Sequence, residues 1–158
     1  HADDLKGIVQ GIKRLLNPSG IFVFEVSYLV DVFEKTLFDT IYHEHLAYHS
    51  VGPLIKFFQA NGMELIEVER VETHGGSLRG FAQLINGPRT VGASVERLVK
   101  LEKDLELDKS ETFQGFESRI NSIKVELTRT LKGLKAQGKR LQDSVPPQKQ
   151  PLLCTNLA

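Results

Sequence analysis

The feature that most constrains the fold is a short, almost continuously apolar run at residues 21–26, Ile-Phe-Val-Phe-Glu-Val. β-branched and aromatic residues dominate it, as is typical of a strand buried on both faces of a parallel sheet. The preceding apolar residues recur at three- and four-residue spacings, which predicts a helix from Leu5 to Leu16 with Asp3 or Asp4 as N-cap. A helix that leads into a buried strand is half of a βαβ unit, so we expect an α/β fold.

The following segments continue this pattern. Residues 51–60 predict a helix with Ser50 as its N-cap, and residues 63–71 and 77–85 predict two strands. Between the strands, the turn at 73–77 contains paired glycines, which allow a positive φ or a close approach to a ligand. The order of elements indicates the second half of a doubly wound sheet that ends in an antiparallel strand. We expect the first half of this sheet to lie upstream, since the chain begins with a histidine.

The second predicted strand shows strict alternation. One face is expected to carry Met63, Leu65, Glu67, Glu69 and Val71, and the other Ile66 and Val68.

After Gly87 the sequence changes to amphipathic helical patterns. Apolar residues at 95–105 predict one helix, and those at 113–134 predict a second helix with near-heptad spacing. These helices are expected to carry no chemistry, and to pack on the core, bridge to a further domain, or pair as a short coiled coil. We therefore divide the chain into an α/β unit at 1–91, a helical segment at 92–141, and a tail at 142–158.

Composition excludes several classes of protein. Of the 158 residues, 41% are hydrophobic, and 20 basic residues balance 20 acidic ones, so no overall field favours nucleic acid or an anionic membrane as partner. No apolar run is long enough to span a bilayer. Because Cys154 is the single cysteine, an internal disulfide is excluded, which fits a cytoplasmic location. The sequence assigns no oligomeric state.

Polar groups able to do chemistry concentrate at residues 38–49, Phe-Asp-Thr-Ile-Tyr-His-Glu-His-Leu-Ala-Tyr-His. This stretch holds three of the five histidines, whose charge can change near neutral pH. Ligands of open α/β sheets bind beyond the carboxyl ends of the strands, so the stretch should lie at the mouth of a site. Two other interpretations remain: structural histidines, or a metal site built from His43, His45 and His49.

Two motifs carry a resemblance to a known family. FDTIYHEHL at 38–46 and THGGSLR at 73–79 resemble the S-adenosylmethionine-dependent sugar C-methyltransferases, which methylate C3 of nucleotide-linked 4-keto-deoxysugars. The resemblance extends from His1 to about Arg140. It implies that the α/β unit is the second half of a class I methyltransferase core, Rossmann-like, and that the helices lead into a C-terminal Rossmann-like domain. It also implies that a zinc-binding segment and the glycine-rich cofactor loop lie upstream.

The resemblance suggests roles for individual residues. Methyl transfer to carbon requires an enolate, and the family's motif places the general base on His45. Tyr42 is expected to donate a hydrogen bond to the developing oxyanion or to a sugar hydroxyl, and Glu44 to orient the imidazole or anchor the sugar. His1 matches a family histidine in the same pocket. His74 is a candidate substrate contact, and Arg79 a candidate phosphate ligand; their structural alternatives are a turn residue and a solvated arginine.

The resulting expectation is a fragment of a C-methyltransferase, inactive alone, that uses S-adenosylmethionine, needs no metal, and acts on a nucleotide-linked ketosugar. The alternative is a non-catalytic α/β and helical interaction module, in which the helices after Gly92 mediate assembly. A metal-dependent enzyme is the third hypothesis.

The tail departs from the family pattern after Arg140. A neighbouring reading frame can encode AGFGASAKATTLMYQLG, which resembles the family's next segment. We therefore hypothesise that a one-base deletion shifted the frame, and we expect a disordered tail.

Overall fold

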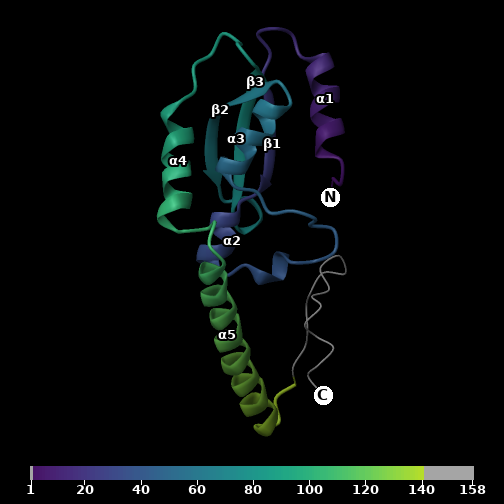
Figure 1. The fold of residues 1–158 in the computed structure, drawn as a ribbon. Helices are drawn as coiled ribbons and strands as arrows, with labels where there is room; N and C mark the ends of the chain where they lie inside the picture. The colour runs from purple at the N-terminus through teal and green to yellow at the C-terminus, as the bar shows by residue number, and fades with distance from the viewer. Residues whose placement is uncertain (1, 141–158) are drawn as a thin grey trace.

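The computed structural model describes residues 2–140, which form a three-stranded sheet with helices (Figure 1). The predictions for His1 and for the tail at 142–158 lie outside this part of the chain. No helix within the described range is long and apolar enough to cross a membrane. The helices and strands, in order, are α1 (Leu5–Leu15), β1 (Phe22–Ser27), α2 (Leu29–Lys35), α3 (Val51–Ala60), β2 (Met63–Val71), β3 (Ser77–Leu84), α4 (Ala93–Asp104) and α5 (Ser110–Ala136), with short 3-10 turns at Phe38–Thr40 and Thr73–Gly75.

The sheet has the order β1-β3-β2, and β3 runs antiparallel to both of its neighbours. β1 and β2 are therefore parallel to each other, although they are not adjacent. The mixed α/β class and the antiparallel final strand are confirmed. Within the described residues, β1 pairs only with the antiparallel strand β3, so the doubly wound parallel sheet expected from residues 21–26 is not confirmed there.

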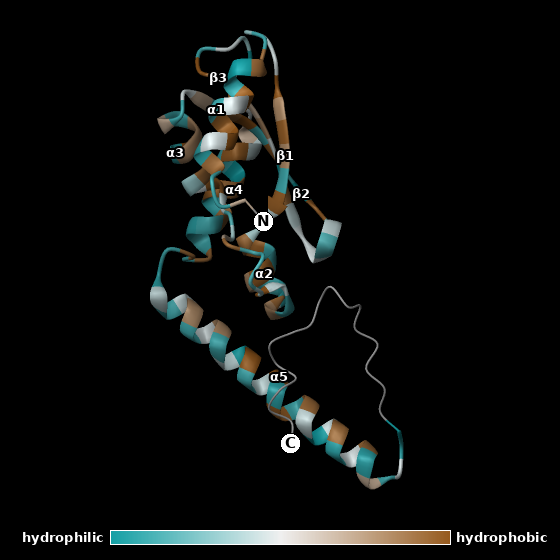
Figure 2. Cartoon of the chain, turned by 90° about the vertical axis from the view of Figure 1, so that its right-hand side faces the viewer, coloured by the Kyte–Doolittle hydropathy of each residue, from teal (hydrophilic) through white to brown (hydrophobic). Residues whose placement is uncertain are grey.

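One face of the sheet carries the core. The ring of Phe58 on α3 lies 5.3 Å from that of Phe24 and 6.5 Å from that of Phe22, between ring centroids. Helices α1, α3 and α4 lie together on this side of the sheet (Figure 2). The predicted burial of β1 on both faces is wrong here, since the side chain of Val23 on the other face is 51% exposed.

A β-bulge in β2 breaks the alternation predicted from the sequence. The pairing with β3 shifts between Leu65 and Glu67, so that Ile66 is the extra residue. Leu65, Ile66 and Val68 are all buried, whereas Glu67 is exposed. The backbone carbonyl of Ile66 accepts a hydrogen bond from the amide of Gly92 at the start of α4, 2.8 Å away. The bulge thus lets β2 bury three apolar residues and also anchor α4.

The predicted helices 5–16, 51–60 and the two after Gly92 are all present. Asp4 caps α1 by accepting a hydrogen bond from the Gly7 amide at 2.7 Å. Ser50 occupies the N-cap position of α3, but its side chain makes no capping hydrogen bond. Instead, the carboxylate of Glu102 on α4 accepts hydrogen bonds from the amides of Val51 and Gly52. The cap of α3 therefore comes from another helix, which fixes the packing of α4 on α3.

Candidate active site

Backbone hydrogen bonds of His49, the last residue of the stretch 38–49, hold this stretch against the carboxyl end of β1. Tyr28 and His49 form a parallel β-bridge. The amide of Leu29 donates to the carbonyl of His49 at 2.9 Å, and the amide of His49 donates to the carbonyl of Ser27 at 3.4 Å. The polar stretch thus folds back onto the strand end, where the sequence placed the mouth of a site.

A cavity of about 520 Å³ lies at this strand end. It is bounded by the end of β1, the start of β3, the stretch 38–49 and the turn before β3. Its polar lining includes Tyr42, His45 and His74, three of the residues expected at the site. The remaining lining residues are Glu25, Val26, Ser27, Thr40, Ala47, His49 and Ser77.

Tyr42 and His45 form a close pair beside the cavity. The Tyr42 hydroxyl lies 2.8 Å from Nε2 of His45, and Nδ1 of His45 lies 2.9 Å from the carbonyl oxygen of Thr40. A carbonyl oxygen can only accept, so Nδ1 carries the proton in this arrangement. Nε2 of the neutral ring then carries the lone pair that accepts the hydrogen bond of the Tyr42 hydroxyl. The arrangement presents a base and a phenolic donor side by side.

The carbonyl oxygen of Thr40 also accepts a hydrogen bond from a third aromatic side chain, that of Tyr48. The hydroxyl of Tyr48 donates to this carbonyl at 2.7 Å, and the rings of Tyr48 and His45 meet edge to face. Burial raises the pKa of Tyr48 above its usual value. Tyr48 therefore stays a protonated donor that holds the carbonyl in place. The sequence did not single out Thr40 or Tyr48, because a backbone acceptor leaves no signal in the pattern of side chains.

The other candidate residues lie around this pair. His43 is largely exposed, and its Nε2 lies 3.9 Å from a carboxylate oxygen of Glu44. Glu44 itself is half exposed and does not line the cavity. Within residues 2–140, no three histidine, cysteine or acidic side chains are placed to hold a metal ion, so the hypothetical set of His43, His45 and His49 is not assembled.

The turn before β3 approaches α2 closely. His74 has a positive φ of 54°, and Gly76 has a φ of 148°. A Cβ atom on Gly76 would lie 2.3 Å from Cβ of Asp31, so only glycine fits there. The prediction that the paired glycines serve a positive φ is confirmed, and the close approach is to Asp31 of α2. This turn places His74 at the rim of the cavity.

Asp31 anchors the region behind that turn, although no pattern in the sequence singles it out. Its carboxylate is 2% exposed and accepts hydrogen bonds from Nε and Nη2 of Arg70, at 3.3 and 2.8 Å. Lys35 adds an ion pair at 3.0 Å. The hydrogen bond to Asp31 raises the pKa of Arg70 further above its already high value. The buried charge is thus paired, and it links α2 to β2.

Arg79 projects from β3 beside the cavity. Its guanidinium pairs with Glu25 at 3.1 Å and with Glu69 at 3.5 Å. Glu25 lines the cavity, and Arg79 does not. Any anion that binds Arg79 would have to compete with these two carboxylates.

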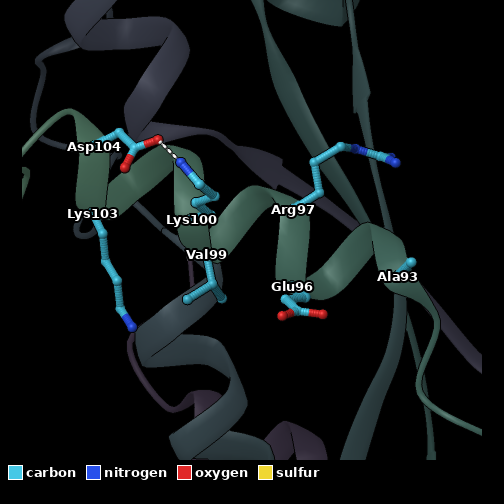
Figure 3. A pocket seen from close by; sticks show the side chains of 7 residues that line it. All are labelled: Ala93, Glu96, Arg97, Val99, Lys100, Lys103 and Asp104. Atoms are coloured by element: carbon cyan, nitrogen blue, oxygen red, sulfur yellow. Dashed lines mark hydrogen bonds and ion pairs between the residues drawn. The ribbon is translucent and has the colours of Figure 1, made fainter.

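A second hollow of similar volume runs along α4 (Figure 3). Every residue that lines it comes from this one helix, and Arg97 and Lys103 extend in opposite directions in the figure. Ion pairing of Lys100 with Asp104 neutralises part of the surface. Without converging polar groups, this hollow lacks the features of a ligand site.

Two comparisons with known proteins indicate the same family. Residues 72–149 match the model of the C-methyltransferase C-terminal domain. The chain is also 30% identical over 149 residues to the C-methyltransferase NovU of Streptomyces niveus. The chain belongs to the C-methyltransferase family. The aligned region covers 94% of this chain and 36% of NovU, so the chain spans about a third of the length of this relative.

The matched domain of the C-methyltransferase family begins just before the turn that carries His74. It therefore includes β3, α4 and α5, and it continues beyond the described residues. The alignment with NovU extends over nearly the whole chain. Family membership thus rests on both the sheet and the helical segment.

Proposed function

We propose that this chain carries the proton-abstracting part of an S-adenosylmethionine-dependent C-methyltransferase, which acts at C3 of a nucleotide-linked 4-keto-deoxysugar. Membership of the C-methyltransferase family supports the reaction class. The observation that carries the proposal is the pairing of Tyr42 and His45 over a cavity at the end of β1. In this proposal the chain forms the second half of a class I methyltransferase core, and the parallel relation of β1 and β2 supports that assignment.

His45 is the general base of the proposed reaction. Its Nδ1 proton is held by the Thr40 carbonyl, and the lone pair on Nε2 accepts the hydrogen bond of the Tyr42 hydroxyl. When the sugar's ketone oxygen accepts the Tyr42 hydroxyl proton in a hydrogen bond, Nε2 loses that partner and can take a proton from the adjacent carbon. The imidazole becomes an imidazolium, and the electron pair of the C–H bond moves into the enolate.

Tyr42 stabilises the enolate oxygen by donating the hydrogen bond that it makes to His45 in the structure. The enolate carbon is then the nucleophile for methyl transfer, and the imidazolium later returns its proton to water. S-adenosylmethionine supplies the electrophilic methyl group on a sulfonium.

The described residues suit the sugar rather than the methyl donor. The polar lining of the cavity consists of imidazoles, hydroxyls and one carboxylate, which can hydrogen-bond a sugar. Residues 2–140 contain no glycine-rich turn between a parallel strand and a helix, the usual cradle of such a cofactor. The cradle was expected upstream, and we assign no donor contact to the described residues.

The remaining candidates are proposed as substrate contacts. His74 lies at the rim of the cavity, within reach of a bound sugar. Arg79 would bind a phosphate by exchanging its contacts with Glu25 and Glu69. We propose that Glu44 anchors the sugar, and His1, outside the described residues, stays a candidate substrate contact.

The test replaces the aligned region of NovU by this chain and assays methyl transfer to a panel of nucleotide-linked 4-keto-6-deoxysugars. His45→Gln should lower the rate by about 100- to 10,000-fold, the usual contribution of a general base. The matched control is His43→Gln, because His43 is exposed and does not line the cavity. We expect that variant to stay within about twofold of the parent chimera.

Binding to the 158-residue chain itself provides a second measurement. A sugar of the panel should shift the NMR signals of the Tyr42 and His45 rings, and those of His43 much less. A folded chimera that binds S-adenosylmethionine but methylates none of the sugars would contradict the substrate class. Equal rates for His45→Gln and the parent would place the base elsewhere.

A further inference from the structure

Helix α2 contacts both segments that carry the candidate residues of the cavity. It lies at the end of the sheet where β1 and β2 terminate (Figure 1), and the stretch 38–49 follows it after two residues. Lys35, in the last turn of α2, donates a hydrogen bond of 2.7 Å to the carbonyl of Gly75, in the turn before β3. His74, the neighbour of Gly75, lines the cavity from this turn. One short helix thus joins the two segments.

The turn before β3 has a backbone conformation that needs support. His74, Gly75 and Gly76 all have positive φ values, of 54°, 89° and 148°. A positive φ is unfavourable for a residue with a Cβ atom, so the conformation of His74 persists only where neighbouring contacts hold it. Within the turn, the carbonyl of Thr73 accepts a hydrogen bond of 3.0 Å from the Gly76 amide. The hydrogen bond from Lys35 adds a tie to a separate helix.

Helix α2 can support the turn because it is itself anchored on two sides. The buried carboxylate of Asp31 pairs with Arg70 on β2, at 2.8 Å. On the side of α5, the guanidinium of Arg119 lies 4.4 Å from the centre of the Phe33 ring and donates a hydrogen bond of 2.7 Å to the Phe33 carbonyl. Lys35 also pairs with Asp31, at 3.0 Å, but Asp31 keeps its partner Arg70 when Lys35 is replaced. A substitution of Lys35 should therefore leave α2 in place.

We propose that Lys35 is a positioning residue, which holds the Thr73–Gly75 turn so that His74 stays at the cavity and contacts the sugar. The inference rests on the proposed function, in which His74 is a substrate contact. Lys35 does not line the cavity, so it acts on the substrate only through the turn. Because Lys35 orders the turn beforehand, the substrate does not have to order it on binding, which favours affinity.

The first measurement is the hydrogen exchange of the Gly76 amide in the 158-residue chain, followed by NMR. Lys35→Met keeps a long side chain but removes the ammonium group, so the turn should open more often. The Gly76 amide should then exchange about tenfold faster, as expected for the loss of a hydrogen bond from a charged donor. Lys35→Arg retains a charged donor and should keep the slow exchange. Unchanged exchange in Lys35→Met would overturn the proposal.

The matched control is Glu34→Gln. Glu34 precedes Lys35 on the same helix, but it pairs with Arg70 and not with the turn. The exchange of Gly76 should therefore stay within about twofold of the parent.

The second measurement separates positioning from a purely structural role. In the chimera with NovU, Lys35→Met should raise the KM for the sugar about tenfold and leave kcat within about threefold, since it weakens binding and not the chemical step. His74→Asn should raise KM similarly, because asparagine tolerates the positive φ but removes the imidazole. The double variant should show no more than the larger single effect, because Lys35 acts through His74.

The outcomes distinguish this inference from the proposed function. Additive effects of the two substitutions, or a KM that either single substitution leaves unchanged, would overturn the role of Lys35. A parent chimera that folds, binds S-adenosylmethionine and methylates none of the sugars would instead contradict the proposed function. The exchange of the Gly76 amide would then still decide whether Lys35 holds the turn.

Discussion

The hydroxyl of Tyr28 donates a hydrogen bond of 3.0 Å to Oε1 of Glu102, across 74 positions of the chain. The same carboxylate accepts the amides of Val51 and Gly52 at the start of α3. Burial and the neighbouring Glu102 raise the pKa of Tyr28, so the phenol remains a donor. Because Tyr28 is bridged to His49, one carboxylate on α4 fixes both α3 and the end of the stretch that carries Tyr42 and His45.

Replacement of Glu102 should therefore destabilise the fold. Glu102→Gln keeps the shape but loses the charge and turns one acceptor into a donor that faces backbone N–H groups. We expect the free energy of unfolding to fall by about 1–3 kcal/mol, the cost of leaving buried donors unsatisfied. Urea unfolding followed by circular dichroism measures this change.

The matched control is Glu96→Gln on the same helix, because Glu96 is exposed. Its effect should stay within about 0.5 kcal/mol. Equal stability of the two variants would mean that Glu102 does not cap α3.

Gly80 on β3 provides a test of the sheet's packing against α3. A Cβ atom at this position would lie 2.2 Å from the ring of Phe24, which is itself confined by Phe22 and Phe58. Gly80→Ala should cost about 1–3 kcal/mol, as is usual for overpacking. Thermal or urea unfolding measures the loss.

Gly115 in α5 is the contrasting site, since nothing lies within 4 Å of a Cβ atom there. Gly115→Ala should stabilise the chain by up to about 1 kcal/mol through helix propensity. A destabilising effect of the same size at both glycines would contradict this account of the packing.

The sequence predicted the positions of individual helices and strands better than the contacts between them. The helix at 51–60 was found because its apolar spacing is local, and the structure places it at those same residues. The group that caps this helix is the carboxylate of Glu102, which lies 50 positions beyond Gly52 in the chain. No local pattern reports a contact over such a separation, so the sequence pointed to Ser50 instead.

Strand pairing was less predictable for the same reason. The apolar run of β1 fits a strand buried on both faces, but its pairing depends on where β3 returns, which the run itself does not encode. The bulge at Ile66 likewise lies at a contact with the distant Gly92, and it interrupts the simple alternation of β2. At the site, the sequence indicated Tyr42, His45 and His74, which do line one cavity. Their catalytic and binding roles remain predictions.

His49 should make the stability of the chain depend on pH. Burial lowers the pKa of its imidazole below the ordinary value of about 6.5. As the pH falls below about 6.5, the unfolded chain takes up a proton at this residue that the folded chain does not bind. The free energy of unfolding should therefore be fully retained above this pH and should decrease as the pH falls towards the pKa of the folded state.

Urea unfolding of the chain and of His49→Gln between about pH 8 and about pH 5, a range around the ordinary pKa, isolates this contribution. The variant should lose less stability on acidification than the parent, because the other histidines are common to both. An identical or steeper decrease in the variant would contradict a lowered pKa at His49.

The two hydrogen bonds of the His45 ring select one tautomer. The Thr40 carbonyl requires a proton on Nδ1, and the Tyr42 hydroxyl then donates to Nε2. Nitrogen-15 NMR of the imidazole should show the neutral ring with its proton on Nδ1, in contrast to the tautomer with the proton on Nε2. Tyr42→Phe should preserve that tautomer, because the Thr40 contact remains, but should change the Nε2 shift as its hydrogen bond is lost. The exposed His43 serves as an internal comparison, and its nitrogen shifts should respond much less to Tyr42→Phe, because no hydrogen bond joins it to Tyr42. A proton found on Nε2 in the parent would show that His45 lacks the lone pair towards Tyr42 on which its role as a base depends.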